Sequence, residues 1–431
     1  MAGLTRGFTG YFGFMRQLLV KNTGAEVSNQ YRSASHLRTV HVWMMAFSAG
    51  AIVANIYYIQ PLLSAIAANF HISVSTVGAV AMVSQLGTAL AMLVFVPLGD
   101  TKERRRLIVR LLLAASICLV LMACARNVWW LVLASLGVGF TGAIVHVIVP
   151  YAANLSAPDR RGATVGTVLS GVLFGILLAR TLSGLVGARF GWRAIYWLAA
   201  VLMLVVATLI HTGLPSSEPE LKLSWLALIR SAGALIRSQP LLREATLLGA
   251  IFFCAFSAFW TTLVFFLQTP PYHYGSGVAG LFGLVGAAGA ICAPLIGRTA
   301  DRYGARRNIL VALLLTLTSF VVLYTLGTHM AGLAAGVILL DVGVQAGHVS
   351  NQTRIYGLVP EARSRLNMVY MIGYFIAGAF GSYAGTVFWQ HFAWAGVCGF
   401  GSVLLLGGCV IYGITGKSAR TSGRSKKQIA G

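Results

Sequence analysis

Charged side chains are scarce in this sequence. Asp, Glu, Lys and Arg together make up 10% of its 431 residues, against about a quarter in an ordinary soluble domain. No charged residue occurs between Thr39 and Gly99, or between Ala245 and Gly297. Hydrophobic residues make up 57% of the chain, and the mean hydropathy is +0.79. This composition excludes a soluble globular protein and predicts a chain whose main partner is the lipid bilayer.

The signatures of several chemistries are also missing. No P-loop sequence is present, which argues against ATP hydrolysis by this chain. The six cysteines are scattered through apolar stretches without a Cys-x-x-Cys pair, and no His and Glu stand at the spacing of metal ligands. We therefore expect no cofactor, no metal site and no enzyme activity.

The apolar stretches are continuous and do not alternate with polar residues. A membrane-spanning helix needs about 20 apolar residues, whereas a barrel strand alternates polar and apolar residues over about 10. Because a backbone in hydrocarbon must satisfy its own hydrogen bonds, continuous stretches predict helices. We expect an all-α membrane protein with twelve transmembrane helices, over residues 38–63, 75–98, 107–125, 128–152, 163–187, 192–213, 244–268, 277–299, 307–327, 330–352, 366–388 and 391–413.

The net charge of +22 is explained by topology. With twelve spans in place, 28 of the 32 Lys and Arg fall on one side of the membrane, three fall on the other, and Arg180 lies within a span. Basic loops remain in the cytoplasm, so both termini are expected there. This distribution accounts for the positive charge without nucleic-acid binding, and we expect none.

The chain contains an internal repeat. The charged turn that holds Asp100 recurs 201 positions later at Asp301, and His146 has a counterpart 202 positions later at His348. Such a duplication predicts two pseudo-symmetric six-helix halves with a substrate site between them, near the middle of the bilayer.

The repeat divides the chain into five segments. Between the halves stands a linker rich in Pro, Ser and Glu, followed by an amphipathic segment around Trp225 that is expected to lie along the membrane face. The basic tail is expected to be disordered. The expected segments are a cytoplasmic arm over 1–37, a first half over 38–213, a cytoplasmic linker over 214–243, a second half over 244–413 and a cytoplasmic tail over 414–431.

Several motifs resemble those of the major facilitator superfamily. The pattern Gly-x-x-x-Asp-Arg-x-Gly-x-Arg-Arg at 297–307 resembles the loop after the second helix of each half in that family. The copy at 96–106 departs from it at Val96 and Glu103. Three further segments are similar to a bacterial branch of arabinose-efflux permeases and drug:proton antiporters: 55–63, 97–100 and 350–354. The resemblance covers residues 38–413 and implies alternating access by rocking of the two halves.

The resemblance also implies a role for the charged turns. In the family, acids and cations of these turns make contacts in one access state that break in the other, and an acid beside several Arg residues is suited to such a contact. A plain topology signal is the alternative explanation. The residues assigned to this conformational latch are Asp100, Arg104, Arg105, Arg106, Asp301, Arg302, Arg306 and Arg307.

Small residues recur in the fifth and eighth expected spans. Glycines follow one another there at spacings of three to five, which allows helices to approach closely. The resemblance implies that these two helices meet across the two halves. Packing within one half is the alternative.

Two charged residues are expected well inside the spans, Arg180 in the fifth and Asp341 in the tenth. Burying either one alone costs about 3 kcal/mol or more, so each needs a partner or a water-filled cavity. Asp341 is the only acid placed to hold a proton in the membrane interior. We hypothesise that it takes up and releases the coupling proton, with Arg180 as its charge partner. The alternative is a static buried pair that fixes helix packing.

Uncharged polar residues in the spans are candidates for lining a substrate cavity. The first span has no acid and the fourth has no Arg, so the chain departs from the better-known antiporter pattern. A buried histidine is often only a hydrogen-bonded packing residue, which is the alternative for both histidines. The candidates are Asn55, Tyr58, Gln60, His146, Asn154, Gln345, His348, Asn351 and Gln352.

These patterns predict a monomeric transporter of the bacterial inner membrane. We expect proton-coupled export of a small-molecule substrate, drug-like or a sugar, with export implied by the resemblance. One alternative is an uptake facilitator or proton symporter for a small solute. The other is a transporter-like receptor without net flux.

Overall fold

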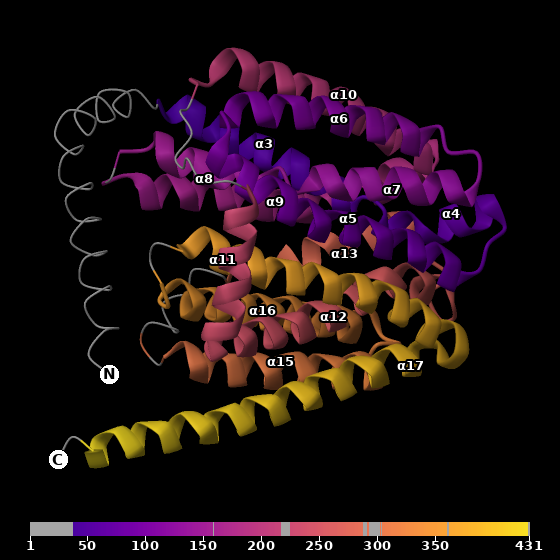
Figure 1. The fold of residues 1–431 in the computed structure, drawn as a ribbon. Coiled ribbons are helices and arrows are strands. Elements are labelled where there is room, and N and C mark those ends of the chain that lie inside the picture. The colour runs from indigo at the N-terminus through magenta and orange to yellow at the C-terminus, as the bar shows by residue number, and fades with distance from the viewer. Residues whose placement is uncertain are drawn as a thin grey trace.

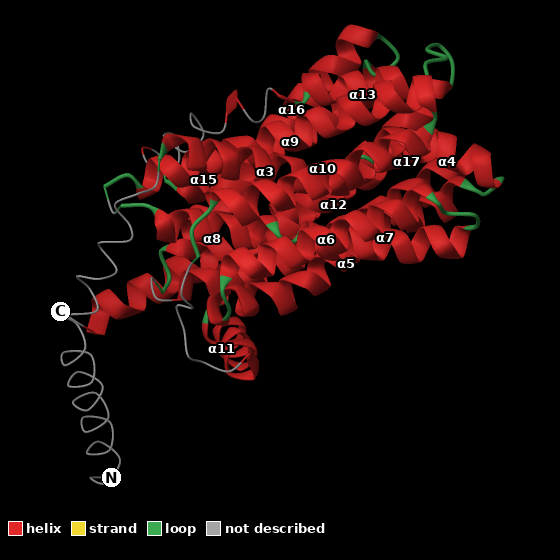
Figure 2. Ribbon diagram, turned by 90° about the horizontal axis from the view of Figure 1, so that it is seen from above, coloured by secondary structure: helices red, strands yellow, loops and turns green. Residues whose placement is uncertain are grey.

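The computed structural model describes residues 38–157, 159–216, 225–287, 291–292, 302, 304–359 and 362–429, without the side chains of Asp100 and residues 416–429. All regular elements in these residues are helices, and no strand occurs among them (Figure 2). The helices run roughly along one axis of the molecule (Figure 1). The all-helical class predicted from the sequence is confirmed.

The helices follow one another in two groups. The first group comprises α3 (Thr39–Tyr57), η1 (Gln60–Leu62), α4 (Leu63–Phe70), α5 (Val74–Thr101), α6 (Arg104–Ala123), α7 (Val128–Gly142), α8 (Val145–Leu155), α9 (Arg161–Phe190) and α10 (Trp192–Gly213). After α11 (Trp225–Ser238), the second group comprises α12 (Pro240–Gln268), α13 (Ser276–Val285), α15 (Ala305–Thr325), α16 (Met330–Tyr356) and α17 (Arg363–Ile429). The two groups lie side by side in Figure 1 and form the two halves of the molecule.

Ten stretches of the described residues are long and apolar enough to cross a bilayer. The last of them, within α17, is interrupted at Ala393, whose φ of 50° and ψ of −144° are not helical, so this stretch holds two of the expected spans. The helix α13 begins the span expected at 277–299, and most of the later residues of that span lie outside the described residues.

Side-chain caps begin several of the helices. The Ser73 hydroxyl accepts a hydrogen bond from the backbone N–H of Thr76 at 3.2 Å at the start of α5. The Glu103 carboxylate accepts from the backbone N–H groups of Arg105 and Arg106 at 3.1 and 3.0 Å at the start of α6. These acceptors satisfy N–H groups that have no partner within the helix. Glu103, which departs from the family pattern, therefore has a local structural role.

The bundle has two ends that the charged turns distinguish. We call the end where α3 begins and α16 ends the tail end, and the opposite end, which carries α4, the distal end (Figure 1).

The amphipathic segment of the linker forms α11, which lies across both halves. Trp225 Nε1 donates to the Leu93 carbonyl oxygen in α5 at 3.1 Å, and Arg365 Nη1 in α17 donates to Ser231 Oγ at 3.0 Å.

The two halves are in close contact where α9 meets α13. Thr181 Oγ1 in α9 donates to the Gly280 carbonyl oxygen in α13 at 3.0 Å. A Cβ atom added to Gly280 would lie 2.9 Å from the Cα of Gly184, whereas one added to Gly162 or Gly166 would have no neighbour within 4 Å. The close approach therefore involves the distal part of α9. The expectation that the fifth and eighth spans meet across the halves is confirmed.

The basic tail differs from the prediction. It was expected to be disordered, whereas α17 continues as one helix through Ile429. Extending an existing helix adds one hydrogen bond for each residue that is ordered, whereas starting a new helix is unfavourable. The tail contains no proline that would stop this extension.

The glycine contact between α9 and α13 gives a first prediction. Replacing Gly280 with Val places side-chain atoms against the backbone of Gly184 and Arg180, and such overpacking costs about 1–3 kcal/mol. We expect a lower midpoint of thermal unfolding for purified Gly280→Val. The control is Gly166→Val on α9, which faces open space and should unfold close to wild type. Equal midpoints for the two variants would contradict this packing.

Candidate functional site

Arg180, in the distal half of α9, is buried between the two halves. Only 1% of its surface is exposed. Its Nε donates a hydrogen bond to Gln60 Oε1 at 2.7 Å. Its guanidinium carbon lies 3.8 Å from the centre of the Trp260 ring, which is the geometry of a cation–π contact. Its two terminal nitrogens, Nη1 and Nη2, are buried without a hydrogen-bond partner among the described residues.

A break in the first span positions Gln60. The helix α3 ends at Tyr57, a short 3₁₀ helix begins at Gln60, and α4 then continues to Phe70. Pro61 has no N–H to donate and therefore favours a change of helix at this point. The tightened turn places the buried amide of Gln60 beside Arg180.

Asp341, in α16 of the second half, lies close to the same site. It is 8% exposed, and its Oδ2 has no hydrogen-bond partner among the described residues. Its carboxyl group lies against Gly286, where an added Cβ would be 3.0 Å from Oδ1. Trp260 stands beside both Asp341 and Arg180, although its buried Nε1 makes no hydrogen bond of ordinary geometry.

Arg180 and Asp341 lie along one segment of the second half, because an added Cβ would be 2.9 Å from the Cβ of Arg180 at Gly283 and 3.0 Å from Asp341 Oδ1 at Gly286. No nitrogen of Arg180, however, comes within the 4.0 Å of a carboxylate oxygen that would make a direct ion pair. The structure therefore brings together the two charged residues singled out in the spans. It does not join them as a bonded pair.

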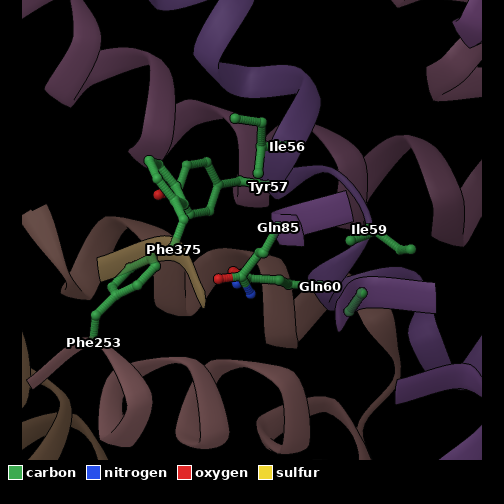
Figure 3. A pocket seen from close by; sticks show the side chains of 8 residues that line it. Ile56, Tyr57, Ile59, Gln60, Gln85, Phe253 and Phe375 are labelled. Atoms are coloured by element: carbon green, nitrogen blue, oxygen red, sulfur yellow. The ribbon is translucent and has the colours of Figure 1, made fainter. Parts of the chain in front are cut away.

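A small pocket adjoins this site (Figure 3). The amides of Gln60 and Gln85 point into the same space, beside the rings of Tyr57, Phe253 and Phe375. A second pocket shares Gln60 and reaches Arg180 and Trp260. Each has room on the order of one water molecule. Side chains of both halves line each of them, so the pockets lie on the boundary between the halves.

Gln85 was missed in the sequence. From α5 it donates a hydrogen bond through Nε2 to Ser382 Oγ in α17 at 2.7 Å, and its Oε1 accepts from Ser257 Oγ in α12 at 3.5 Å. Thr261 Oγ1 donates to Ser382 Oγ at 3.1 Å. This buried network, which we call the polar bridge (Gln85, Ser257, Thr261 and Ser382), connects the two halves. The available signal was an amide in an otherwise apolar second span.

Neither histidine lines a pocket, although His146 lies beside Phe375, which does. His348 Nδ1 is 3.1 Å from Tyr370 Oη, and the His146 ring lies 6.3 Å from that of Phe375. Tyr58 is buried but does not line the pocket, which Tyr57 does.

Four amide candidates lie outside both pockets. Asn55 Nδ2 bonds Met203 Sδ at 3.3 Å within the first half. Gln352 Nε2 donates to Asn367 Oδ1 at 3.3 Å within the second half. Asn351 is fully buried, and Gln345 is partly buried.

The charged turns make contacts within their own halves. Arg104 Nε donates to the Gly99 carbonyl oxygen at 2.8 Å, and Arg105 Nη1 donates to that of Leu214 at 2.9 Å. Arg106 pairs with Glu103 at 3.5 Å. The structure describes neither the Asp100 side chain nor any part of Asp301. Arg302 is described, but the residues on either side of it are not.

Glu244, at the start of α12, was also missed. Its two carboxylate oxygens pair with Arg306 at 3.0 Å and with Arg354 at 3.1 Å. Arg306 Nη2 also donates to the Tyr412 carbonyl oxygen at 2.9 Å. This cluster holds α12, α15, α16 and α17 together at the tail end. Arg307, next to it in sequence, is exposed.

Comparison with known proteins agrees with this architecture. The family model described as Major Facilitator Superfamily matches residues 45–328 and 271–430. The "Uncharacterized transporter YgaY" of Escherichia coli O157:H7 is 42% identical over 363 residues, which cover 84% of this chain and 92% of that protein. A "Probable sugar efflux transporter" of Pasteurella multocida is 27% identical over 361 residues, covering 80% of this chain and 86% of that protein.

A solved structure has the same fold. The crystal structure of a peptide transporter, POT, in complex with sulfate matches with a TM-score of 0.73 at 14% identity, covering 92% of this chain and 99% of that one. At this identity the likeness concerns the fold alone. The predicted fold, with two helical halves of the major facilitator type, is confirmed.

The polar bridge gives a second prediction. Gln85→Leu removes hydrogen bonds to Ser382 and Ser257, and a hydrogen bond between membrane helices contributes about 0.6–1.7 kcal/mol. We expect the distal contact between α5 and α17 to loosen. The measurement is the rate of disulfide formation between cysteines introduced at Ser75 and Gln390, where the Ser75 backbone N–H now donates to Gln390 Oε1 at 3.4 Å. The rate should fall in Gln85→Leu.

The matched control for this experiment is Gln352→Leu. Gln352 also donates an amide hydrogen bond, but to Asn367 within the same half. Its loss should leave the cross-linking rate unchanged. An unchanged rate in Gln85→Leu would show that the polar bridge does not hold the distal contact.

The Glu244 cluster gives a third prediction. Glu244→Gln leaves Arg354, whose side chain is 9% exposed, without its acid, and breaking a buried pair in this way costs about 3 kcal/mol. We expect a clear drop in the midpoint of thermal unfolding. The control is Asp159→Asn, which breaks an ion pair whose side chains are 77% and 83% exposed and should cost under about 1 kcal/mol. Similar midpoints for both variants would contradict the assignment.

Proposed function

The chain belongs to the Major Facilitator Superfamily, and from this premise we propose that it is a proton-coupled secondary transporter that exports a small organic solute. In this proposal the solute site lies between the halves, around Arg180 and the two pockets. The two halves, over 38–213 and 244–413, move against each other to expose that site to either side of the membrane. The protein works as a monomer.

The observation that carries the proposal is the placement of Arg180 and Asp341. They are buried beside the same segment around Gly283 and Gly286, they come from opposite halves, and no direct ion pair joins them. An ionised Asp341 attracts the Arg180 cation across the boundary, and a protonated Asp341 does not. Proton uptake would therefore change the attraction between the two halves. A static pair that only fixes packing would gain most from direct contact, which is missing here.

One relative supports the direction of transport, and the charge distribution supports the orientation of the chain in the membrane. Among the relatives is a protein named a sugar efflux transporter. The excess of Lys and Arg at the tail end favours a cytoplasmic tail end and cytoplasmic termini in the inner membrane. The named contacts between α9 and α13 are then on the periplasmic side of the site.

The charged turns fit the same scheme as a conformational latch. Arg104 and Arg105 hold the tail end of the first half through carbonyl groups, and Arg306 holds that of the second half through Glu244. We propose that these contacts rearrange when the halves move. Asp100, Arg106, Asp301, Arg302 and Arg307 belong to the same proposed latch.

A vesicle experiment tests the coupling. Purified protein is reconstituted with an imposed pH gradient, the internal pH is followed with a dye, and a panel of sugars, organic acids and drug-like compounds is added. We expect a transported compound to dissipate the gradient in wild type and not in Asp341→Asn. The control is Asp159→Asn, which removes an exposed acid far from the pockets in sequence and should behave as wild type.

Each outcome of this experiment assigns a mechanism. Compound flux with no proton movement in wild type would make the protein a facilitator and reduce Asp341 to packing. Proton movement that survives in Asp341→Asn would place the coupling group elsewhere. The sign of the pH change separates exchange from uptake together with a proton, which is the alternative function.

A further inference from the structure

The free end of Arg180 points to a ligand. A buried guanidinium ordinarily uses its N–H groups, since leaving them unpaired away from water is costly. Arg180 uses Nε on Gln60, whereas Nη1 and Nη2 have no partner among the described residues and 1% of the residue is exposed. Stacking on Trp260 compensates part of the charge but none of the terminal N–H groups.

Arg193 shows that stacking does not by itself leave these groups empty. Its guanidinium carbon lies 4.3 Å from the centre of the Trp192 ring, in an arrangement like that of Arg180 on Trp260. Its Nη1 nevertheless donates to Asn69 Oδ1 at 2.7 Å, and its Nη2 donates to the Ala125 carbonyl oxygen at 3.0 Å. The open pair of nitrogens is thus a property of the Arg180 site.

The space around Arg180 selects the shape of the ligand. The pocket at Arg180 has room for about one water molecule and is otherwise lined by apolar residues, Trp260 and Gln60. Gln60 also lines the neighbouring pocket, which is walled by Tyr57, Phe253 and Phe375. Once the halves separate enough to admit a solute larger than water, its charged group would meet the arginine and an apolar or aromatic body would meet the rings.

We propose that Arg180 binds a carboxylate group of the transported solute through Nη1 and Nη2, which makes the solute a small organic acid with an apolar body. The two parallel N–H donors of a guanidinium match the two oxygens of a carboxylate, and such charge-assisted bonds are the strong ones. A neutral sugar offers no charge to the buried cation. Asp341 lies near enough to repel the incoming anion when it is ionised.

This inference specifies the solute of the proposed transport site, but it is tested by binding alone. Purified protein is titrated with benzoate and with benzamide, which has nearly the same size and no charge. Binding is measured by isothermal titration calorimetry. We expect wild type to bind benzoate about ten-fold more tightly than benzamide or better, because hydrogen bonds to charged groups are strong.

Four variants then identify the residue that is responsible for the preference for benzoate over benzamide. Arg180→Gln should bind the two compounds equally. Arg180→Lys keeps the charge but loses the paired donors, so it should retain a reduced preference even if Arg180→Gln folds poorly. Asp341→Asn should bind benzoate more tightly than wild type, because a repelling group is removed. The matched control, Arg193→Gln, removes the other stacked arginine and should keep the wild-type preference.

The contrary outcomes are equally definite. Equal affinity for benzoate and benzamide in wild type, or no binding of either, would overturn the proposal. If Arg180→Gln still bound benzoate more tightly than benzamide, another cation of the protein would be the one that binds the carboxylate. A failed coupling test with Asp341→Asn in vesicles leaves the binding result unaffected, so failure of the proposed function and failure of this inference are distinguishable.

Discussion

A cation that cannot leave the membrane interior is the constraint on which the centre of this protein depends. Arg180 is almost fully buried in a chain with few charges to offer, and the free energy of burying it must be offset locally. The means are an amide oxygen from Gln60, the face of Trp260 and the nearby charge of Asp341. These groups come from both halves, so the cation belongs to the boundary between them.

The same boundary explains where other polar groups lie. The hydrogen bonds among Gln85, Ser257, Thr261 and Ser382 cross this boundary. They satisfy polar groups in the membrane interior, where bulk water is not available as a partner. Charged groups outside the centre have a different task. Glu244 and its arginines hold helices of one half at the tail end. Polar contacts at the boundary thus join the two halves, and the Glu244 contacts at the tail end join helices within one half.

Much of this arrangement could be predicted from the sequence, for physical reasons. Continuous apolar stretches force helices, and a charge inside such a stretch is conspicuous, so Arg180 and Asp341 stood out. Glycine spacing in the fifth and eighth spans indicated close packing, and the family resemblance implied that these two helices meet, as α9 and α13 do. Gln85 and Glu244 were missed because their roles depend on partners far away in the sequence. Gln85 bonds a residue 297 positions away, and Glu244 pairs with one 110 positions away. The helical tail was missed because the composition of the tail alone does not show that a helix precedes it and can continue into it.

Two glycines of α13 and Gly286, which caps its end, connect the boundary to its charges. An added Cβ would meet the backbone of Gly184 and Arg180 at Gly280, the Cβ of Arg180 at Gly283, and the carboxyl group of Asp341 at Gly286. One ridge, with a residue every 1.5 Å along the axis, therefore touches the packing surface, the cation and the acid in turn. Sliding of α9 along that ridge would alter the separation of opposite charges in a medium of low dielectric constant, where small displacements carry large energies. Under such sliding, α13 would convert mechanical displacement into electrostatic potential energy.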